Sequence, residues 1–311
     1  MRVVLAGGSG FLGRALTRAL VARGDDVTVL TRQAASPSRS VRFVVWRPDA
    51  TIAMGQPSQE WSREIDGADA IVNLAGAGLA DRRWTHTRKN VLRASRLAST
   101  RQLVAAIRSA AQRPGVLVQG SAVGYYGAHD DEVLDETAAP GSDFLALLAR
   151  DWEAESKVAE TFGCRVVRLR SGVVLAQDGG ALARMLPPFR LGLGGPIASG
   201  RQYLSWIHRD DWVALVVRTL EQPSMAGAVN ATSPTPVTNA AFTRALGAEL
   251  HRPAVVPLPA FVLRALFGEV ADVTLVHGQR VVPAAALDAG FTFRYPEIRQ
   301  ALAAALAEAR G

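Results

Sequence analysis

Short apolar runs alternate with longer segments of helical periodicity over the first 175 residues of the chain. Spaced apolar residues predict helices at about 15–21, 85–111 and 143–162, and a short helix before residue 69. Such alternation predicts a parallel sheet with helices on both faces, joined by right-handed crossovers. Six runs have the length and composition of buried strands: residues 3–6, 27–32, 42–46, 69–76, 115–120 and 165–169.

The pattern changes after residue 172, where glycine and proline become frequent at 178–200. A helix through about residue 220, a strand at 228–230 and three further helices, near 238–250, 259–268 and 296–309, follow. We predict an α/β protein with a Rossmann-type doubly wound parallel sheet and a smaller C-terminal α+β substrate domain. The first domain would span 1–175 and take the chain back at about 204–232, and the second would span 176–311. The loop 187–200 is our candidate for a segment that covers a substrate.

Composition narrows the class of protein. About half of the 311 residues are apolar, yet no stretch approaches the roughly 20 consecutive apolar residues of a membrane helix. The chain enters its first strand at once, which leaves no room for a signal peptide. The single cysteine, Cys164, excludes an intrachain disulfide. We therefore expect a cytoplasmic protein that does not bind membranes.

The net charge of +7 makes nucleic acid a partner worth considering. However, the basic residues are scattered and usually stand beside acids, as in Arg150-Asp151 and Arg209-Asp210-Asp211. No basic block is interleaved with aromatic residues. The five histidines are isolated from one another, so the sequence contains no metal-ligand cluster either. We expect no nucleic-acid partner and no metal.

The first apolar run opens into a glycine-spaced turn that leads into an amphipathic helix. A backbone without side chains lets phosphates approach closely, and a helix N-terminus directs unpaired N–H groups at their charge. The strand–turn–helix context is what a dinucleotide-binding turn requires. The alternative is a tight βα loop without a ligand. The predicted cofactor contacts are Gly7, Gly8, Ser9, Gly10, Phe11, Leu12 and Gly13.

The end of the second run indicates which dinucleotide is bound. Enzymes that select NAD usually carry an acid here, about 20 residues after the glycines, to bind the ribose hydroxyls. This chain has Thr31 and Arg32 instead. A carboxylate would repel a 2′-phosphate, whereas a guanidinium binds it with two hydrogen bonds. We predict NADP as the cofactor; the alternative is that Arg32 is a solvated charge at a strand end.

Together, these features and an ordered series of further motifs resemble the extended short-chain dehydrogenases/reductases. The chain is most similar to their atypical NAD(P)-dependent epimerase/dehydratase subfamily, which has its own C-terminal domain of unknown function. The motifs cover essentially the whole chain: Gly7–Gly13, Asn73-Leu74-Ala75-Gly76, Arg83-Trp84, Ser95-Arg96, Ser121-Ala122-Val123-Gly124-Tyr125-Tyr126-Gly127, Trp152-Glu153, Arg170–Leu175, Pro188–Pro196, Trp206-Ile207-His208, Gly278-Gln279-Arg280 and Gly290-Phe291.

The resemblance implies further cofactor contacts and a quaternary arrangement. Arg96 would reach the phosphate side of the cofactor, unless it is a surface arginine of its helix. The helices at 85–111 and 143–162 occupy the places where extended relatives form a four-helix dimer interface, which allows a homodimer. Two further segments would contact the cofactor: Leu74, Ala75 and Gly76 beside the adenosine ribose and phosphates, and Gly172, Val173 and Val174 beside the nicotinamide.

The resemblance fails at the catalytic pair. Most short-chain dehydrogenases use a tyrosine as general acid/base and a lysine four residues later. Counting back from Glu153, this chain has Leu145 and Ala149 at those positions. The remaining candidates are Ser121 and Tyr126, which would help to place a substrate or else have a structural role at the strand end. The spacing to the next glycine leaves open whether Ala122 occupies the serine position.

Two readings of function remain. The first is an NADP(H)-dependent oxidoreductase or epimerase-like enzyme that acts on an unidentified small molecule. The second is a catalytically degenerate NADPH-binding protein whose cofactor occupancy controls a partner. In either case we expect His208 and Asp211 to fix a helix start rather than to catalyse, and Arg190, Gln202 and Arg280 to offer polar contacts from the second domain.

Overall fold

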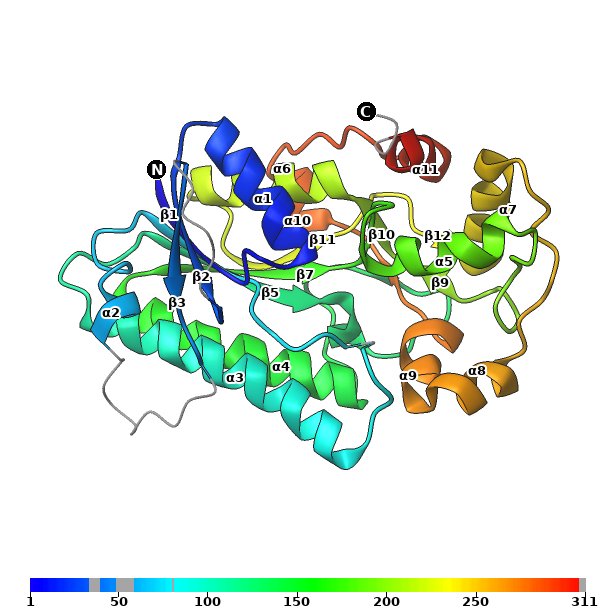
Figure 1. Cartoon of the computed structure of the whole chain (residues 1–311), viewed down its shortest axis with the longest axis horizontal. Coiled ribbons are helices and arrows are strands. Elements are labelled where there is room, and N and C mark those ends of the chain that lie inside the picture. Colours follow the sequence, from blue (N-terminus) through cyan, green and yellow to red (C-terminus); the bar gives the residue numbers. More distant parts are fainter. Residues whose placement is uncertain (34–39, 49–58, 80, 308–311) are drawn as a thin grey trace.

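A parallel seven-stranded sheet forms the centre of the structure, a computed structural model that describes residues 1–33, 40–48, 59–79 and 81–307 (Figure 1). Every strand pair of this sheet is parallel, and the strand order reverses direction beside β1. This is the predicted doubly wound Rossmann-type α/β fold. In spatial order the strands are β3 (Val41–Val45), β2 (Asp26–Thr31), β1 (Arg2–Ala6), β4 (Ala70–Asn73), β5 (Val116–Ala122), β7 (Arg165–Ser171) and β11 (Gly227–Ala231).

Alternate residues of the strands build two separate cores, because successive side chains point to opposite faces. In β1, Val3 and Leu5 pack under α1 (Phe11–Ala22) and α6 (Arg209–Glu221), whereas Val4 and Ala6 belong to the core on the other face. That second face is covered by α2 (Gln59–Ser62), α3 (His86–Ser109) and α4 (Phe144–Lys157), as Figure 1 shows. Both faces of the sheet are therefore buried, which explains why its strands are nearly continuous apolar runs.

The predicted strand at 69–76 is shorter in the structure, since β4 ends at Asn73. The buried Asn73 side chain accepts a hydrogen bond from the Ala75 N–H at 3.1 Å and donates to Thr100 and Gln119. An asparagine that bonds to the backbone two residues on turns the chain out of the strand. Residues 74–76 therefore lie beyond the end of the sheet.

The chain beyond β7 forms several helices and short strands past the carboxyl edge of the sheet (Figure 1). These are β8 (Val173–Leu175), α5 (Gly180–Arg190), β9 (Tyr203–Leu204), β10 (Trp206–His208), β12 (Val237–Thr238), α7 (Asn239–Leu250), α8 (Ala260–Phe267), α9 (Glu269–Ala271), β13 (Arg280–Val281) and α11 (Ile298–Ala307). The helix α10 (Ala284–Asp288) returns to the sheet, where Ala286 joins the core that contains residues of α1 and α6. The strand β6 (Val133–Leu134) pairs with β13, and the one-turn helix η1 (Val123–Tyr126) follows β5.

One expectation about this part is wrong. The segment from 187 to 200 was expected to be a loop, but its first residues belong to α5, which contains Pro187 and Pro188. The prolines keep φ near the helical value, so the chain continues on a helical path, but their missing N–H groups remove two helical hydrogen bonds and the helix ends at Arg190. The buried Leu186 and Phe189 hold this turn against a core with α7 and α11.

Among the described helices, none combines the length and the apolar character that crossing a membrane requires.

Candidate functional site

The glycine-spaced turn lies at the carboxyl edge of the sheet, where ligands bind in folds of this type. Gly7 has a φ of +83° and its N–H donates to the Leu30 carbonyl at 3.4 Å, which ties the turn to the end of β2. A Cβ atom at Gly7 would lie 2.8 Å from the carbonyl carbon of Leu74. The structure therefore brings together three segments predicted to contact the cofactor.

Three glycines of the turn are required by the fold itself. Besides the close approach at Gly7, a Cβ at Gly8 would lie 2.7 Å from the Val29 side chain. At Gly13 it would lie 2.2 Å from the Gly7 oxygen, inside the first turn of α1. These glycines allow the helix to begin directly against the sheet, whether or not a ligand is bound.

Gly10 differs from the other three glycines of the turn. It is exposed, its φ of −74° suits any residue, and a Cβ there would meet only the Gly7 oxygen, at 3.3 Å. Gly10 is also the N-cap of α1, and no side chain of the described residues caps that helix end. The first-turn N–H groups of α1 thus lack a capping side chain among the described residues, which suits an anionic ligand.

Phe11 connects the turn to α5, in the part of the chain beyond β7. A Cβ at Gly179 would lie 2.3 Å from the Phe11 ring, and one at Gly180 would lie 3.1 Å from it. The start of α5 therefore packs directly against the start of α1. Ser9 is exposed, and its carbonyl accepts a hydrogen bond from Arg14 at 2.8 Å.

Thr31 and Arg32 lie where the sequence predicts them, at the end of β2 beside the turn. The Thr31 hydroxyl accepts the Gln33 N–H at 3.4 Å. The Arg32 side chain is exposed, next to the segment at 34–39, which lies outside the described residues.

Arg96 is buried rather than on the surface of its helix. Its guanidinium donates to the carbonyls of Ala77, at 3.0 Å, and Leu92, at 3.2 Å, and lies 5.1 Å from the Trp152 ring centroid. Burial, together with the charge of Arg88, lowers the pKa of Arg96 to about 10, so it remains a cation at neutral pH. Arg96 holds the chain that follows β4, and its predicted reach toward a cofactor phosphate stays a prediction.

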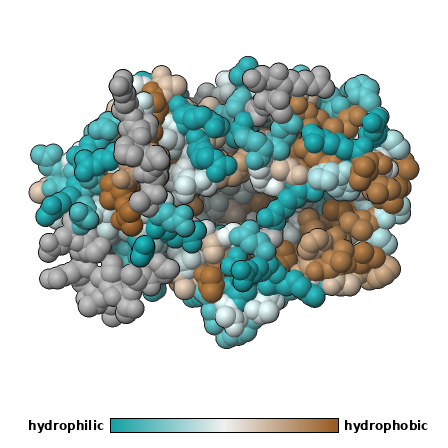
Figure 2. All heavy atoms as spheres, in the orientation of Figure 1, coloured by the Kyte–Doolittle hydropathy of each residue, from teal (hydrophilic) through white to brown (hydrophobic). Residues whose placement is uncertain are grey.

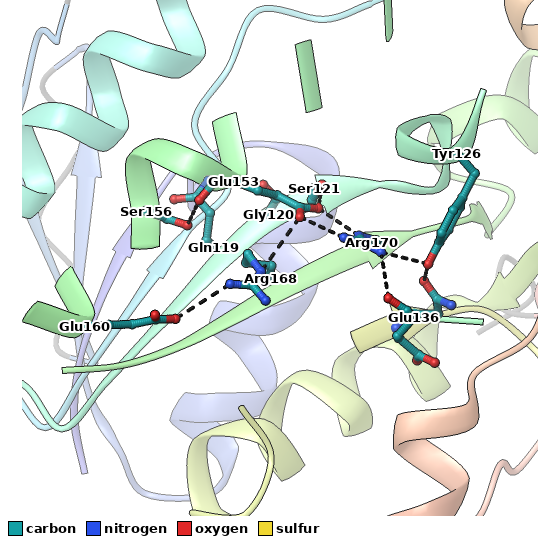
Figure 3. A network of polar contacts seen from close by, with 11 residues as sticks. Gln119, Gly120, Ser121, Tyr126, Glu136, Glu153, Ser156, Glu160, Arg168 and Arg170 are labelled. Carbon is teal, nitrogen blue, oxygen red and sulfur yellow. Dashed lines mark hydrogen bonds and ion pairs between the residues drawn. The ribbon is translucent and has the colours of Figure 1, made fainter. Parts of the chain in front are cut away.

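Ser121 and Tyr126 lie in one buried polar network, drawn in Figure 3. The Ser121 hydroxyl donates to Glu153 Oε1 at 2.7 Å. Arg170 donates to both oxygens of the same carboxylate at 2.9 Å and to the Tyr126 hydroxyl at 3.0 Å. The Tyr126 hydroxyl in turn donates to Asn230 Oδ1 at 2.7 Å. The network joins β5, η1, α4, β7 and β11.

The edges of this network are also satisfied within the protein. The Arg170 guanidinium lies 3.5 Å from the centroid of the Tyr125 ring and donates to the Glu136 carbonyl at 3.3 Å. Arg168 lies between Glu153, at 3.7 Å, and Glu160, at 3.6 Å. A buried Arg–carboxylate pair with two hydrogen bonds and neighbouring polar partners is a rigid arrangement.

Protonation in the network is fixed at physiological pH. Burial raises the pKa of the Tyr126 phenol to about 12, although the Arg170 charge and its hydrogen bond act in the opposite direction. Burial also opposes the charge of Arg170, but the hydrogen bonds and charge of Glu153 raise its pKa above the ordinary value. Tyr126 is therefore a neutral phenol whose hydroxyl already has a donor and an acceptor.

Leu145 and Ala149 stand at the positions where related enzymes carry the tyrosine and the lysine. Leu145 is half-buried, and a Cβ at Gly124 would lie 3.4 Å from its Cβ. Ala149 is buried against the sheet. Ala122 follows Ser121 in β5, so the two side chains point to opposite faces.

The segment predicted to lie beside the nicotinamide is held by backbone contacts. The Gly172 N–H donates to Ala231, and a Cβ at Gly172 would lie 2.5 Å from the Ser205 oxygen. The Val173 N–H donates to the same Ser205 oxygen at 2.8 Å, and Val174 is buried in β8.

The predicted capping role of His208 is confirmed. His208 is the N-cap of α6, and its Nδ1 accepts the Asp210 N–H at 3.1 Å. Asp211 accepts the N–H groups of Arg294 and Tyr295 at 2.7 and 2.9 Å. The ring, rather than an aspartate, thus caps the helix, and Asp211 fastens the segment before α11.

The three polar residues expected from the second domain lie in different surroundings. Gln202 donates to the carbonyls of Ile197 and Leu275 and supports the backbone. Arg280 lies over the Tyr203 ring, 5.0 Å from its centroid. Arg190 is exposed at the end of α5.

The sequence did not reveal the hydrogen-bond partners of Ser121 and Tyr126. The motif series contains Glu153 and Arg170 but assigns them no role, and no motif contains Asn230 or Glu136. A buried strand that carries arginine at alternate positions, as at Arg168 and Arg170, was the available signal, because a buried charge needs a partner.

Comparison with known proteins identifies the family of the chain. Residues 3–231 match the NAD dependent epimerase/dehydratase family, and residues 258–305 match a domain of unknown function, DUF1731. The epimerase family protein Mb2239 of Mycobacterium bovis is 43% identical over 96% of both chains. The human epimerase family protein SDR39U1 is 40% identical over 97% of this chain and 98% of its own.

Solved structures agree. The crystal structure of human SDR39U1 with NADPH matches with a TM-score of 0.85, at 38% identity and 98% coverage of each chain. A nucleoside-diphosphate sugar epimerase from Corynebacterium glutamicum matches with a TM-score of 0.77 at 33% identity, over 98% of this chain and 58% of that one. The chain therefore belongs to the NAD dependent epimerase/dehydratase family.

Proposed function

We propose that this protein binds NADPH and acts as an NADP(H)-dependent oxidoreductase, or an epimerase-like enzyme, on a small molecule. The observation that carries the proposal is the N-terminus of α1, which no side chain among the described residues caps, behind the exposed Gly10. An exposed glycine with an ordinary φ, at a helix end that attracts anions, is explained by a phosphate that must come close. The NADPH in the related human structure supports the same ligand.

Three segments would hold the cofactor. The turn from Gly7 to Gly13 would bind the pyrophosphate through backbone N–H groups, and Arg32 the 2′-phosphate. Leu74 and Ala75, which pack against Gly7, would lie beside the adenosine ribose. Bound NADPH supplies a hydride, and the chain positions it at the carboxyl edge of the sheet. There the network of Ser121 and Tyr126 holds the ends of β5 and β7 in place.

Isothermal titration calorimetry with NADPH and NADH tests the cofactor. We expect the protein to prefer NADPH, and Arg32→Ala to weaken NADPH by about tenfold or more while leaving NADH unchanged, because a charge-assisted hydrogen-bond pair is lost. Arg18→Ala, an exposed arginine on α1, is the matched control and should bind both as the wild type does. A protein that binds neither dinucleotide, or that prefers NADH, would refute the proposal.

A second candidate is an NADPH-binding protein that controls a partner without catalysis. It is favoured by the occupied hydroxyls of Ser121 and Tyr126 and by Leu145 and Ala149 in place of tyrosine and lysine. Incubation with NADPH and panels of quinones, aldehydes and nucleotide sugars, followed by absorbance, separates the two. Tight binding with no turnover on any panel would favour the regulatory role.

A further inference from the structure

The helix α8 is apolar on nearly all sides and yet lies at the surface. Its single polar side chain is Arg264, and only Leu263 is buried. Phe261 is 70% exposed, Leu266 59% and Phe267 47%. A helix that is hydrophobic all round is normally covered, either in a protein core or by lipid. The described residues leave these three side chains largely exposed, which points to a partner outside the chain.

Two neighbouring loops add to the exposed apolar surface. The loop 190–196 lies beside the loop 252–258, because the Val256 N–H donates to the Gly194 carbonyl at 3.1 Å, and the second loop leads directly into α8. Figure 2, in the orientation of Figure 1, shows apolar surface at the end of the molecule that carries α8. The large apolar side chains that the two loops expose are Leu191, Leu193, Val255 and Val256.

The segments that carry these side chains contain basic residues but no acidic ones. Residues 179–208 and 250–268 include five arginines and neither aspartate nor glutamate. Two of these arginines, Arg190 and Arg252, come together where the loops meet, since Arg252 Nε donates to the Arg190 carbonyl at 3.0 Å. Both side chains are exposed, and neither pairs with a carboxylate of the described residues.

A further cation lies at the opposite end of α8. The helix ends at Gly268, and a Cβ there would lie 3.3 Å from Arg83 Nη2. Arg83 is exposed and forms no ion pair within the described part of the chain. The acids that follow the helix are both paired within the protein: Glu269 with Lys89 at 2.6 Å and Asp272 with Arg264 at 2.7 Å. Uncompensated positive charge therefore lies near both ends of an exposed apolar helix.

We propose that α8 docks the protein onto a lipid surface that contains anionic headgroups. Its phenylalanine and leucine side chains enter the boundary between headgroups and acyl chains, and the arginines near its two ends bind the headgroups. The cytoplasmic leaflet of a membrane carries such lipids. A second copy of the chain is a poorer cover, because it would bring two sets of unpaired arginines together. This inference does not depend on the proposed function.

The earlier expectation that the protein does not bind membranes considered only spanning segments. A helix that lies in the plane of the interface does not need the roughly 20 apolar residues of a spanning helix. The apolar character of α8 and the charge around it are sufficient for reversible docking at the surface.

Co-sedimentation of the whole protein with sucrose-loaded vesicles tests the inference. One set of vesicles contains equal amounts of phosphatidylglycerol and phosphatidylcholine, and the other contains phosphatidylcholine alone. We expect the anionic vesicles to bind the protein at least about tenfold more tightly, because each arginine near an anionic surface contributes about fivefold. The difference should shrink as the salt concentration rises.

Substitutions separate α8 from the rest of the surface. Leu266→Ser should weaken binding to the anionic vesicles by about tenfold, since a leucine side chain no longer enters the lipid. Leu287→Ser is the matched control, because Leu287 is 47% exposed on α10, and it should bind as the wild type does. Phe261→Ser, at the other end of α8, should repeat the loss. Arg252→Gln should cost about fivefold, and Arg18→Gln, on α1, should cost less.

Several outcomes would overturn the inference. These are no binding to either kind of vesicle, equal binding to both kinds, and equal binding by Leu266→Ser and Leu287→Ser. Self-association without lipid that Leu266→Ser abolishes, measured by sedimentation velocity, would assign α8 to a second copy and also overturn it. Titration of each variant with NADPH shows whether it is folded, and a wild type that binds vesicles but not NADPH would refute only the proposed function.

Discussion

Two stretches of the same sheet edge treat their polar groups in opposite ways. At the ends of β1 and β2, the first-turn N–H groups of α1 and the exposed Arg32 side chain face outward without a capping side chain among the described residues. At the ends of β5 and β7, Ser121, Tyr126 and Arg170 are buried in one network, in which Ser121 and Arg170 both donate to Glu153 and Arg170 also donates to Tyr126. The polar groups of the first stretch are available to a ligand, whereas those of the second are bonded within the protein.

The difference separates binding from acid/base chemistry. A cofactor is held by geometry and charge that the fold can leave open at a helix end. A general acid needs a group that can lose its proton near neutral pH, and Tyr126, with its pKa raised to about 12, is not such a group. The strand ends that would contact a substrate instead gain rigidity.

The largest effect is expected from Arg170→Met. This change leaves the Glu153 carboxylate buried without its main cation, and breaking a buried pair costs about 3–5 kcal/mol. Urea unfolding of the protein without cofactor should show a loss of that size. The exposed ion pair of Arg101 and Glu155 is the control. The Arg101 side chain is 62% exposed, so Arg101→Met should lower the free energy of unfolding by less than about 1 kcal/mol. Equal losses would mean that the network is not the rigid element.

The opposite stretch should lose binding rather than stability. Gly10→Val adds a side chain at a φ that valine adopts, 3.3 Å from the Gly7 oxygen, where a phosphate must approach. We expect NADPH affinity, measured by calorimetry, to fall by about 100-fold, or about 2.7 kcal/mol.

Thermal unfolding provides the contrast for that variant. Gly10→Val should melt slightly below the wild type without ligand, because valine is a poorer N-cap than glycine and its Cβ would lie 3.3 Å from the Gly7 oxygen. Gly13→Ala should melt clearly lower, because its Cβ would lie 2.2 Å from the Gly7 oxygen and overpacking costs about 1–3 kcal/mol. If Gly10→Val bound NADPH normally, the turn would be only a tight loop.

The two stretches also differ in how well the sequence predicts them. The strands of the central sheet and the turn at Gly7–Gly13 were predictable, because periodicity and glycine spacing are local signals. The fate of Ser121 was not, because its partner Glu153 is 32 residues away and only the packing of α4 on β5 brings them together. Likewise, α5 was hidden by prolines that the last turn of a helix tolerates.

Tyr126→Phe should have a smaller effect on stability. It leaves Asn230 Oδ1 and one Arg170 N–H without their partner, which costs about 2 kcal/mol in urea unfolding. Tyr125→Phe is the control, since the Tyr125 ring over Arg170 is kept and no hydrogen bond of its hydroxyl is found among the described residues. On an identified substrate, a fall in kcat at unchanged KM for Tyr126→Phe would instead assign proton transfer to this residue.

The smallest effect at neutral pH concerns the cap of α6, whose contribution to stability changes only in acid. Burial lowers the pKa of His208 from 6.5 to about 4; the charge of Asp210 acts in the opposite direction, and those of Arg209 and Arg294 add to the lowering. The folded ring is neutral, whereas the unfolded ring takes up a proton below pH 6.5. Its contribution to stability is therefore complete above pH 6.5 and is lost as the pH falls toward 4, at about 1.4 kcal/mol per pH unit.

Asparagine separates the titration from the cap in this last case. His208→Asn keeps an acceptor for the Asp210 N–H, as a good N-cap does, but cannot take up a proton. Unfolding free energies of both proteins between pH 7.5 and 4.5 should diverge below pH 6.5, with the wild type falling faster. Asp211, whose pKa is raised by burial, is present in both and cancels in the difference. Parallel curves would contradict the prediction, because they would show that the buried ring takes up a proton as readily as the unfolded one.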